Sequence, residues 1–135
     1  MAKWQERAAL LFKDQGLHNL KNSNVLIVGV GGVGSFAAEF LARAGVGKIT
    51  IVDGDVVDIT NINRQLPALH STVGMSKIEV VGNRLLDINP ELELTKMQEF
   101  LSPERAFEIV TKDYDYVMDC IDSVTPKINL IRGAK

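Results

Sequence analysis

The sequence lacks several features that would place it among secreted or membrane proteins. Its 135 residues contain one cysteine, Cys120, which excludes an internal disulfide and any zinc site built from several cysteines of this chain. No apolar run reaches the length of a membrane-spanning helix, and the N-terminal stretch "MAKWQERAALLFK" lacks the sustained apolar segment of a signal peptide. We therefore expect a soluble, cytoplasmic protein without a membrane partner.

Net charge is also nearly absent. Fifteen lysines and arginines oppose 17 acidic residues, and the formal charge of -2 excludes a global positive field for nucleic acid, although not a local basic patch. Apolar residues, in contrast, make up 46% of the chain. At this length they can form one core but hardly two, so residues 1–135 are predicted to be a single domain or a piece of one.

Helical and strand patterns alternate along the chain without repeats or low-complexity tracts. Strands are predicted at residues 25–28, "KITIVD", "LELTKM" and "YDYVMD". Helices are predicted over "KWQERAALLF" with an end near Gly16, over "VGSFAAEFLARAG" with Gly45 as its C-cap, between Ser76 and Asn89, after Ser102, and from Thr125. This alternation predicts an α/β fold with a doubly wound, Rossmann-like parallel sheet.

One helix start carries a specific signal. Ser76 is followed three residues later by Glu79, which is the spacing of a capping box. We therefore expect the Ser76 hydroxyl to bond the first turn of the helix that follows.

The first strand ends in a run of glycines, "NVLIVGVGGVGS". Gly29, Gly31 and Gly34 satisfy the pattern G-x-G-x-x-G, and a fourth glycine, Gly32, lies inside it. The helix that follows presents free N–H groups and a positive dipole end to a phosphate. This context favours a nucleotide-binding turn over a plain strand-to-helix connection, but it suits a dinucleotide as well as a mononucleotide.

The second strand ends at Asp53, which lies 24 positions after Gly29. A carboxylate here can accept hydrogen bonds from both ribose hydroxyls, although an acid that merely stabilises the turn is the alternative. Asp55 has a weaker claim on a ligand, because it can instead bond backbone amides of the loop. Up to this point the sequence suits NAD as well as ATP.

Polar residues further along favour ATP. Arg64 and Gln65 lie in the connection after the second strand, and Lys77 lies on the first turn of the helix that follows. A dehydrogenase has no evident use for these groups there. An enzyme that breaks ATP must neutralise charge on the phosphates, for which arginine and lysine are suited. Asp122 follows the fourth strand and can hold Mg²⁺ against those phosphates. Each residue alone is explained by surface solvation, and their joint position at strand exits favours the functional interpretation.

Four blocks together resemble a known family. "GVGGVGS", "ARAGVGKITIVDGDVVDITNINRQ", "TVGMSK" and "DCIDS" are similar to the ATP-dependent adenylyltransferases of the ubiquitin-activating-enzyme-like superfamily, over nearly the whole chain. Within it, "WQER", "TNINRQLPALHSTVG" and "INPELELT" most resemble the tRNA threonylcarbamoyladenosine dehydratase branch. Family members extend well past the equivalent of residue 135, so we expect the N-terminal, nucleotide-binding half of a larger domain.

The resemblance implies a reaction. Such enzymes bind Mg-ATP, a substrate carboxylate attacks the α-phosphate, and pyrophosphate leaves an acyl-adenylate. In the dehydratase branch this carboxylate belongs to the threonylcarbamoyl group of a tRNA adenosine, which then cyclises. The alternatives that remain are adenylation of a ubiquitin-like or sulfur-carrier protein, an NAD-binding oxidoreductase domain, and a noncatalytic piece that retains nucleotide affinity or a dimer surface.

The resemblance also assigns residues. By it, Gly29, Gly31, Gly32 and Gly34 line the phosphate turn, Asp53 holds the ribose, Asn61, Arg64, Gln65 and Lys77 surround the phosphates, and Asp122 binds magnesium. Arg64 and Lys77 would stabilise charge in the transition state. Arg7 resembles an N-terminal arginine that reaches the partner's ATP across a homodimer, although an arginine on a solvated helix face explains it equally well.

Overall fold

The computed structural model of the protein describes residues 2–121 and 131–134. Its sheet contains β1 (Asn24–Val28), β2 (Lys48–Val52), β3 (Glu93–Met97) and β4 (Tyr116–Asp119). The α-helices are α1 (Glu6–Lys21), α2 (Gly34–Ala44), α3 (Lys77–Ile88) and α4 (Pro103–Val110), and short 3₁₀ helices cover Lys3–Gln5, Ile59–Asn61 and His70–Thr72. No helix in this described part of the chain has the length and apolar character needed to cross a bilayer.

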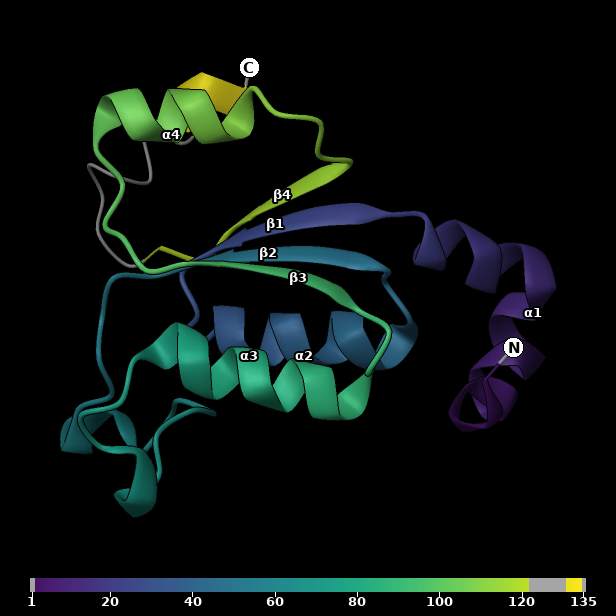
Figure 1. The fold of residues 1–135 in the computed structure, drawn as a ribbon, viewed down its shortest axis with the longest axis horizontal. Helices are drawn as coiled ribbons and strands as arrows, with labels where there is room; N and C mark the ends of the chain where they lie inside the picture. Colours follow the sequence, from purple (N-terminus) through teal and green to yellow (C-terminus); the bar gives the residue numbers. More distant parts are fainter. Residues whose placement is uncertain (1, 122–130, 135) are drawn as a thin grey trace.

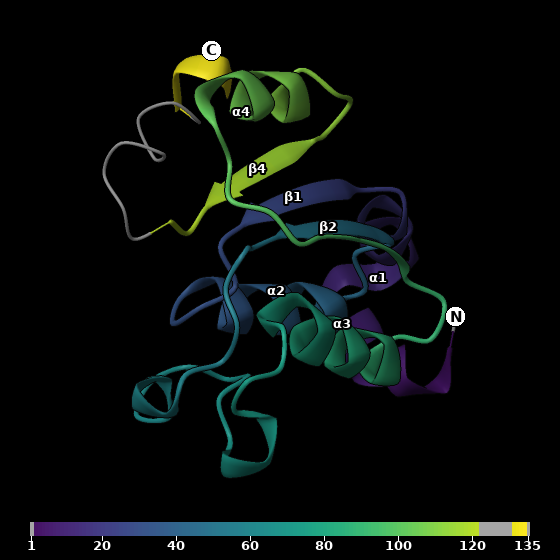
Figure 2. The ribbon, with the colours of Figure 1, turned by 60° about the vertical axis from the view of Figure 1, so that its left-hand side comes forward.

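All neighbouring strands are parallel, and their order across the sheet is β3-β2-β1-β4. Helices α2 and α3 cover one face of the sheet and α4 covers the other (Figure 1). This arrangement confirms the predicted doubly wound α/β fold. Helix α1 lies beyond the end of the sheet at which β1 begins, and its Leu20 packs against the core on the side of α2 and α3 (Figures 1 and 2).

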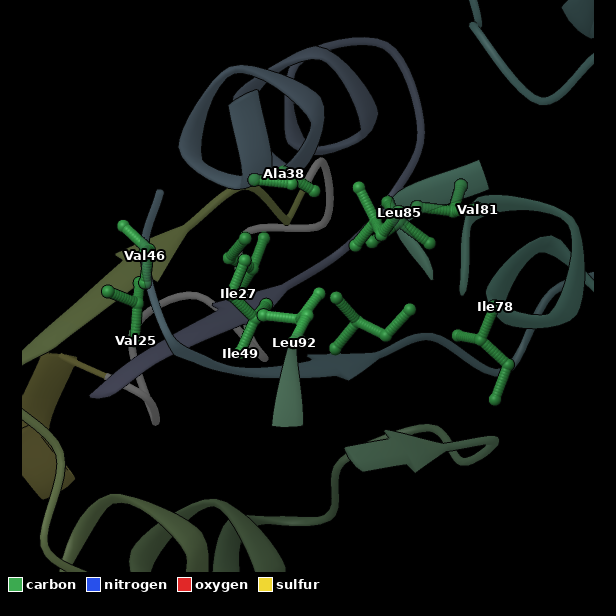
Figure 3. Close-up of a cluster of buried hydrophobic side chains, with 12 residues drawn as sticks. Val25, Ile27, Ala38, Val46, Ile49, Ile78, Val81, Leu85 and Leu92 are labelled. Atoms are coloured by element: carbon green, nitrogen blue, oxygen red, sulfur yellow. The ribbon is translucent and has the colours of Figure 1, made fainter. Parts of the chain in front are cut away.

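The central strands are apolar throughout because they are buried on both faces. Ile27 faces α2 and α3 in the larger core cluster, whereas its neighbour Leu26 belongs to the cluster under α4. In the larger cluster, Ala38 of α2 and Leu85 of α3 pack over the sheet (Figure 3). Full burial of a side chain such as Leu85 contributes roughly 1.5–3 kcal/mol. This packing fixes where β1 and β2 end, and hence where the site lies.

Two helix ends match the sequence prediction. Gly45 has the left-handed conformation, with φ of 101°, and forms the C-cap of α2. Ser102 accepts a hydrogen bond from the Arg105 amide at 3.2 Å and so caps α4. The helix predicted from Thr125 starts among residues outside the described ones.

The first helix is interrupted at Lys13, whose φ of 59° and ψ of 177° are not helical, so its first part ends slightly before the predicted end near Gly16. A second helical segment runs on to Lys21 and buries Leu17. The predicted capping box of α3 is wrong. Ser76 precedes α3 but makes no side-chain cap bond, and its hydroxyl is buried without a partner in the described structure. Glu79, the other half of the expected capping box, pairs instead with Lys96 of β3 at 3.0 Å.

Candidate functional site

A cleft of about 180 Å³ opens at the carboxyl ends of the strands. Residues that follow all four strands line it, among them Gly29, Asp53, Phe100 and Cys120. Ligands of doubly wound sheets bind at this end, so the cleft is the candidate site.

The glycine turn at the exit of β1 is packed too closely for side chains at two positions. Gly29 has φ of 92°, and a Cβ atom there would lie 2.6 Å from the Cys120 carbonyl oxygen. A Cβ atom on Gly34 would collide with the Gly29 carbonyl oxygen. Gly29 and Gly34 are therefore required by the protein's own backbone, which brings the start of α2 directly against the end of β1.

The two inner glycines differ from the outer pair. A Cβ atom on Gly31 would lie 3.2 Å from the Gln65 side-chain nitrogen, whereas on Gly32 the nearest described atoms, of Arg64, would be 4.0 Å away. Among the described residues, no side chain caps α2, whose N-cap residue is Val33. The described neighbours therefore leave room for a side chain at position 32.

Asp53 joins the glycine turn to the loop after β2. Its Oδ2 atom accepts a hydrogen bond from the Val30 amide at 2.9 Å, and Oδ1 accepts one from the Asp55 amide at 2.8 Å. The turn-stabilising role that the sequence left as an alternative is therefore present. Each carboxylate oxygen can accept more than one hydrogen bond, so these contacts leave capacity for ribose hydroxyls.

Lys77 is the buried cation of the cleft. It begins α3, as predicted, and its side chain is 7% exposed. Its ammonium group lies 3.7 Å from Oδ2 of Asp55, whose own side chain is 57% exposed. Bonding of a loop amide, the alternative role considered for Asp55, is performed by Asp53. A buried lysine with one solvated partner favours further negative charge nearby.

The loop after β2 holds Asn61 and Arg64. Asn61 is buried, and its side-chain oxygen accepts a hydrogen bond from the Asp58 amide at 2.9 Å, so it stabilises the loop. A hydrogen bond from the Thr60 hydroxyl holds the pKa of Asp58 below its usual value. The Arg64 guanidinium is exposed and donates to the Asn63 side chain at 3.0 Å. Because the Arg64 stem lies beside Gly32, its guanidinium can reach a ligand on the turn.

Gln65 is buried beside the turn, with 6% of its surface exposed. Its Oε1 atom has no hydrogen-bond partner in the described structure, although the residue lines the cleft. An unpaired buried polar atom costs roughly 1–3 kcal/mol. A ligand or water in the cleft can recover that cost.

Not every predicted residue is at the cleft. Its lining includes Gly29, Gly31, Asp53, Asp55, Gln65 and Lys77. Arg7 is exposed on α1, near the opposite end of the sheet, and is not part of this site within one chain. Asp122 lies outside the described residues. Within them, no three His, Cys, Asp or Glu side chains form a group that could hold a metal ion.

Sequence reasoning missed part of the lining. Glu99, Phe100 and Leu101 follow β3 and form one side of the cleft, although no motif or spacing points to them. Their position directly after a predicted strand was the one feature of the sequence that could have indicated a role at the site. Cys120, which no motif assigned to the site, is half-buried and lines the cleft.

Comparison with known proteins identifies relatives of this chain. A tRNA threonylcarbamoyladenosine dehydratase of Bacillus subtilis (strain 168) is 50% identical over 126 residues, which are 93% of this chain and 50% of the relative. The dehydratase of Escherichia coli (strain K12) is 44% identical over 95% of this chain and 49% of its own length. An adenylyltransferase and sulfurtransferase UBA4 of Kluyveromyces lactis is 46% identical over 80% of this chain and 24% of its own. The chain thus spans about half the length of these two dehydratases.

Solved structures agree with the fold. The crystal structure of E. coli tRNA N6-threonylcarbamoyladenosine dehydratase has a TM-score of 0.93 at 43% identity, over 96% of this chain and 54% of that one. The same enzyme in complex with ATP gives 0.92 at 42% identity, over 97% and 55%. The ThiF family model matches residues 5–132. These matches confirm the resemblance found in the sequence, and the chain belongs to the ThiF family.

Proposed function

We propose that this chain binds Mg-ATP in the cleft and is the nucleotide-binding half of an enzyme that activates a carboxylate by adenylation. The observation that carries the proposal is the convergence of the glycine turn, Asp53 and the buried Lys77 on one cleft. The ATP complex of the E. coli dehydratase, similar to this chain over 97% of its length, supports it.

Each group has a proposed role in binding. The phosphates lie over the turn from Gly29 to Gly34, where the start of α2 offers its positive dipole end. Asp53 accepts hydrogen bonds from the ribose. Lys77 and Arg64 stabilise the charge that grows on the phosphates as pyrophosphate leaves, which is where positive groups lower the barrier.

Magnesium would enter with the nucleotide. This ion binds through one or two carboxylates together with phosphates and water, and needs no cage of protein ligands. We assign the carboxylate to Asp122, which follows β4 closely in sequence. The ion would offset phosphate charge during adenylation.

The proposed substrate is the threonylcarbamoyl carboxylate of a tRNA adenosine, which cyclises once it is activated. The 50% identity to the B. subtilis dehydratase over 93% of the chain supports this choice. An ionised carboxylate can attack the α-phosphate without a general base. Arg7 would complete the partner's site in a homodimer.

A second candidate substrate is the terminal carboxylate of a sulfur-carrier or ubiquitin-like protein. The 46% identity to the UBA4 adenylyltransferase and sulfurtransferase of K. lactis favours it. That match covers 80% of the chain, less than the 93% covered by the B. subtilis dehydratase, so it ranks second.

Calorimetric titration of the chain with Mg-ATP and with NAD tests the binding proposal. We expect tighter binding of Mg-ATP, and equal or tighter binding of NAD would reject the proposal. Exchange of labelled pyrophosphate into ATP then separates the substrates. Stimulation by threonylcarbamoylated tRNA supports the first candidate, and stimulation by a carrier protein supports the second. Binding of ATP without exchange would indicate a noncatalytic nucleotide-binding piece.

A further inference from the structure

A second hollow lies at the other end of the sheet, between α1 and the starts of the strands. Its volume is about 840 Å³, and it shares no lining residue with the nucleotide cleft. Small-molecule pockets in proteins measure roughly 300–1,000 Å³. The hollow therefore has room for an organic ligand, and the proposed nucleotide site does not include it.

Three helices end at this hollow. Lys21, Gly45 and Asn89 of its lining lie at the C-terminal ends of α1, α2 and α3. The last carbonyl groups of a helix have no partner within that helix and carry partial negative charge. Lys21 and Arg43 lie in the last turns of α1 and α2 and offset this charge, whereas the last turn of α3 contains no basic residue. The negative end of α3 is therefore left uncompensated by its own helix.

Carboxylates add to this negative charge. Glu91 follows α3 on a turn held by Asn89, whose buried side-chain oxygen accepts a hydrogen bond from the Glu91 amide at 3.2 Å. Asp14 of α1 also lines the hollow. A third carboxylate, Glu93, pairs with Lys48 at 3.8 Å, but no ion pair among the described residues includes Asp14 or Glu91. Two carboxylates of the lining are thus left for a ligand.

An aromatic ring completes the lining. Trp4 lines the hollow and is 44% exposed. The N-terminal segment that carries it lies directly on the end of α2, because a Cβ atom on Gly45 would be 2.7 Å from the Gln5 side-chain nitrogen. The face of an indole ring attracts cations more strongly than that of any other side chain. Carboxylates, helix C-termini and an indole ring therefore all favour a positively charged ligand.

The arrangement of these groups indicates which kind of cation fits. Within the described residues, no three His, Cys, Asp or Glu side chains form a group that could hold a metal ion. Asp14 and Glu91 belong instead to different elements of the lining, α1 and the turn after α3. Negative charge distributed in this way matches a ligand whose positive charges are also distributed along its length. Lys21 is the opposing charge, and it should weaken the binding of such a ligand.

We propose that the amino-end hollow is a binding site for a linear polyamine. Its ammonium groups bind Asp14 and the corner formed by Glu91 and the end of α3, and Trp4 contacts it through the indole ring. The inference is independent of nucleotide binding. It assigns a second ligand site to the end of the sheet that the proposed adenylation does not use.

The fluorescence of Trp4 provides a direct test. Trp4 is the one tryptophan of the chain, so tryptophan emission reports on the hollow itself. Titration of the chain with spermidine should change this emission until it saturates. Glu91→Gln and Asp14→Asn should each weaken binding roughly 2- to 5-fold, as expected for exposed charge pairs, and the double variant about 10-fold.

Two further variants test the sign and the location of the effect. Lys21→Gln removes the opposing charge, so it should strengthen spermidine binding. Glu104→Gln removes an exposed carboxylate of α4, outside the hollow, and is the matched control that should bind as the unaltered protein does. Calorimetry extends the series to Trp4→Leu, which lacks the fluorophore and should bind roughly 2- to 5-fold more weakly. Circular dichroism will establish that each variant is folded.

The outcomes that would overturn the proposal are distinct. A titration without saturation in both emission and heat would show that the hollow does not bind spermidine. Equal weakening in Glu91→Gln and Glu104→Gln would indicate general attraction of a cation to an acidic protein. Displacement of spermidine by Mg²⁺ at the same concentration of positive charge would show that the distribution of charge along the ligand is not recognised. None of these results would affect the proposed nucleotide site, whose titration with Mg-ATP is separate.

Discussion

The two ends of the sheet are both hollowed, but they differ in chemistry. The hollow at the amino ends is the larger, about 840 Å³ against about 180 Å³ for the cleft at the carboxyl ends. It lies between α1 and the strand starts, with Trp4, His18 and Lys48 in its lining. The smaller cleft contains the glycine turn, a buried lysine and an unpaired buried glutamine oxygen. Volume alone therefore does not identify the site.

Helix direction explains the difference. The lining of the larger hollow includes Lys21, Gly45 and Asn89, which lie at the C-terminal ends of α1, α2 and α3. Helix C-termini carry partial negative charge and disfavour phosphate, whereas helices α2 and α3 both begin at the carboxyl end of the sheet. The same parallel layers thus create one end suited to anions and one that is not.

The largest effect on stability and binding is expected from adding a side chain inside the glycine turn. In Gly34→Ala the new methyl group collides with the Gly29 carbonyl, so we expect a loss of stability of roughly 3 kcal/mol or more and no detectable nucleotide binding. In Gly32→Ala the nearest described atoms are 4.0 Å from the new methyl group, so its free energy of unfolding should lie within about 0.5 kcal/mol of the unaltered protein's. Urea denaturation measures both, and similar losses would show that the turn tolerates neither side chain.

The next largest effect is expected when the positive side chains near the cleft are removed, which should lower the rate of adenylation. Lys77→Ala and Arg64→Ala are each expected to lower adenylation about 100-fold or more, and ATP affinity much less, because charge grows in the transition state. Pyrophosphate exchange and calorimetry separate the two quantities. Lys21→Ala removes a lysine from the amino-end hollow and should leave both unchanged. Unaltered turnover in either cleft variant would remove that residue from the proposed chemistry.

A smaller effect is expected at the ion pair between Glu39 and Arg84, which joins α2 to α3. Glu39 of α2 is 8% exposed and accepts a hydrogen bond from Arg84 of α3, which holds the pKa of its carboxyl below the ordinary value of 4.5. A carboxyl whose pKa is lower in the folded than in the unfolded protein stabilises the fold at pH values above its unfolded-state pKa. This stabilisation is lost as the pH falls through the folded-state pKa.

We therefore expect Glu39→Gln to destabilise the protein by about 1 kcal/mol at neutral pH, since Arg84 is half-exposed and its interaction is screened. The difference from the unaltered protein should shrink as the pH falls below 4.5. Urea unfolding across this pH range checks the sign, and a difference that grows on acidification would contradict it.

The smallest effect is expected at the amino end. His18 is exposed and contacts Asn22, the C-cap residue of its helix, so His18→Ala should change stability by less than about 0.5 kcal/mol. Its ATP affinity, measured by the same calorimetry, should equal that of the unaltered chain. A weakened affinity would show that the two ends are coupled.

Local sequence determined the elements and the position of the site. Strands β1 to β4, the Gly45 cap, the Ser102 cap and the glycine turn depend on residues close in the chain, whose apolar period, φ preference or hydrogen bonds act over a few positions. The alternation of strands and helices predicted a parallel sheet, in which all strands end on the same side. The sequence therefore placed Asp53 and Lys77 at one end of the sheet before their contacts were known.

Tertiary structure decided the features that depend on distant residues. A helical segment after the break at Lys13 buries Leu17, Glu79 pairs with Lys96 in place of a capping box, and Lys77 pairs with Asp55. The Phe100 ring lies beside Gly54, and these two residues follow different strands. Such contacts depend on which surfaces the folded sheet brings together, and no local periodicity or propensity encodes that.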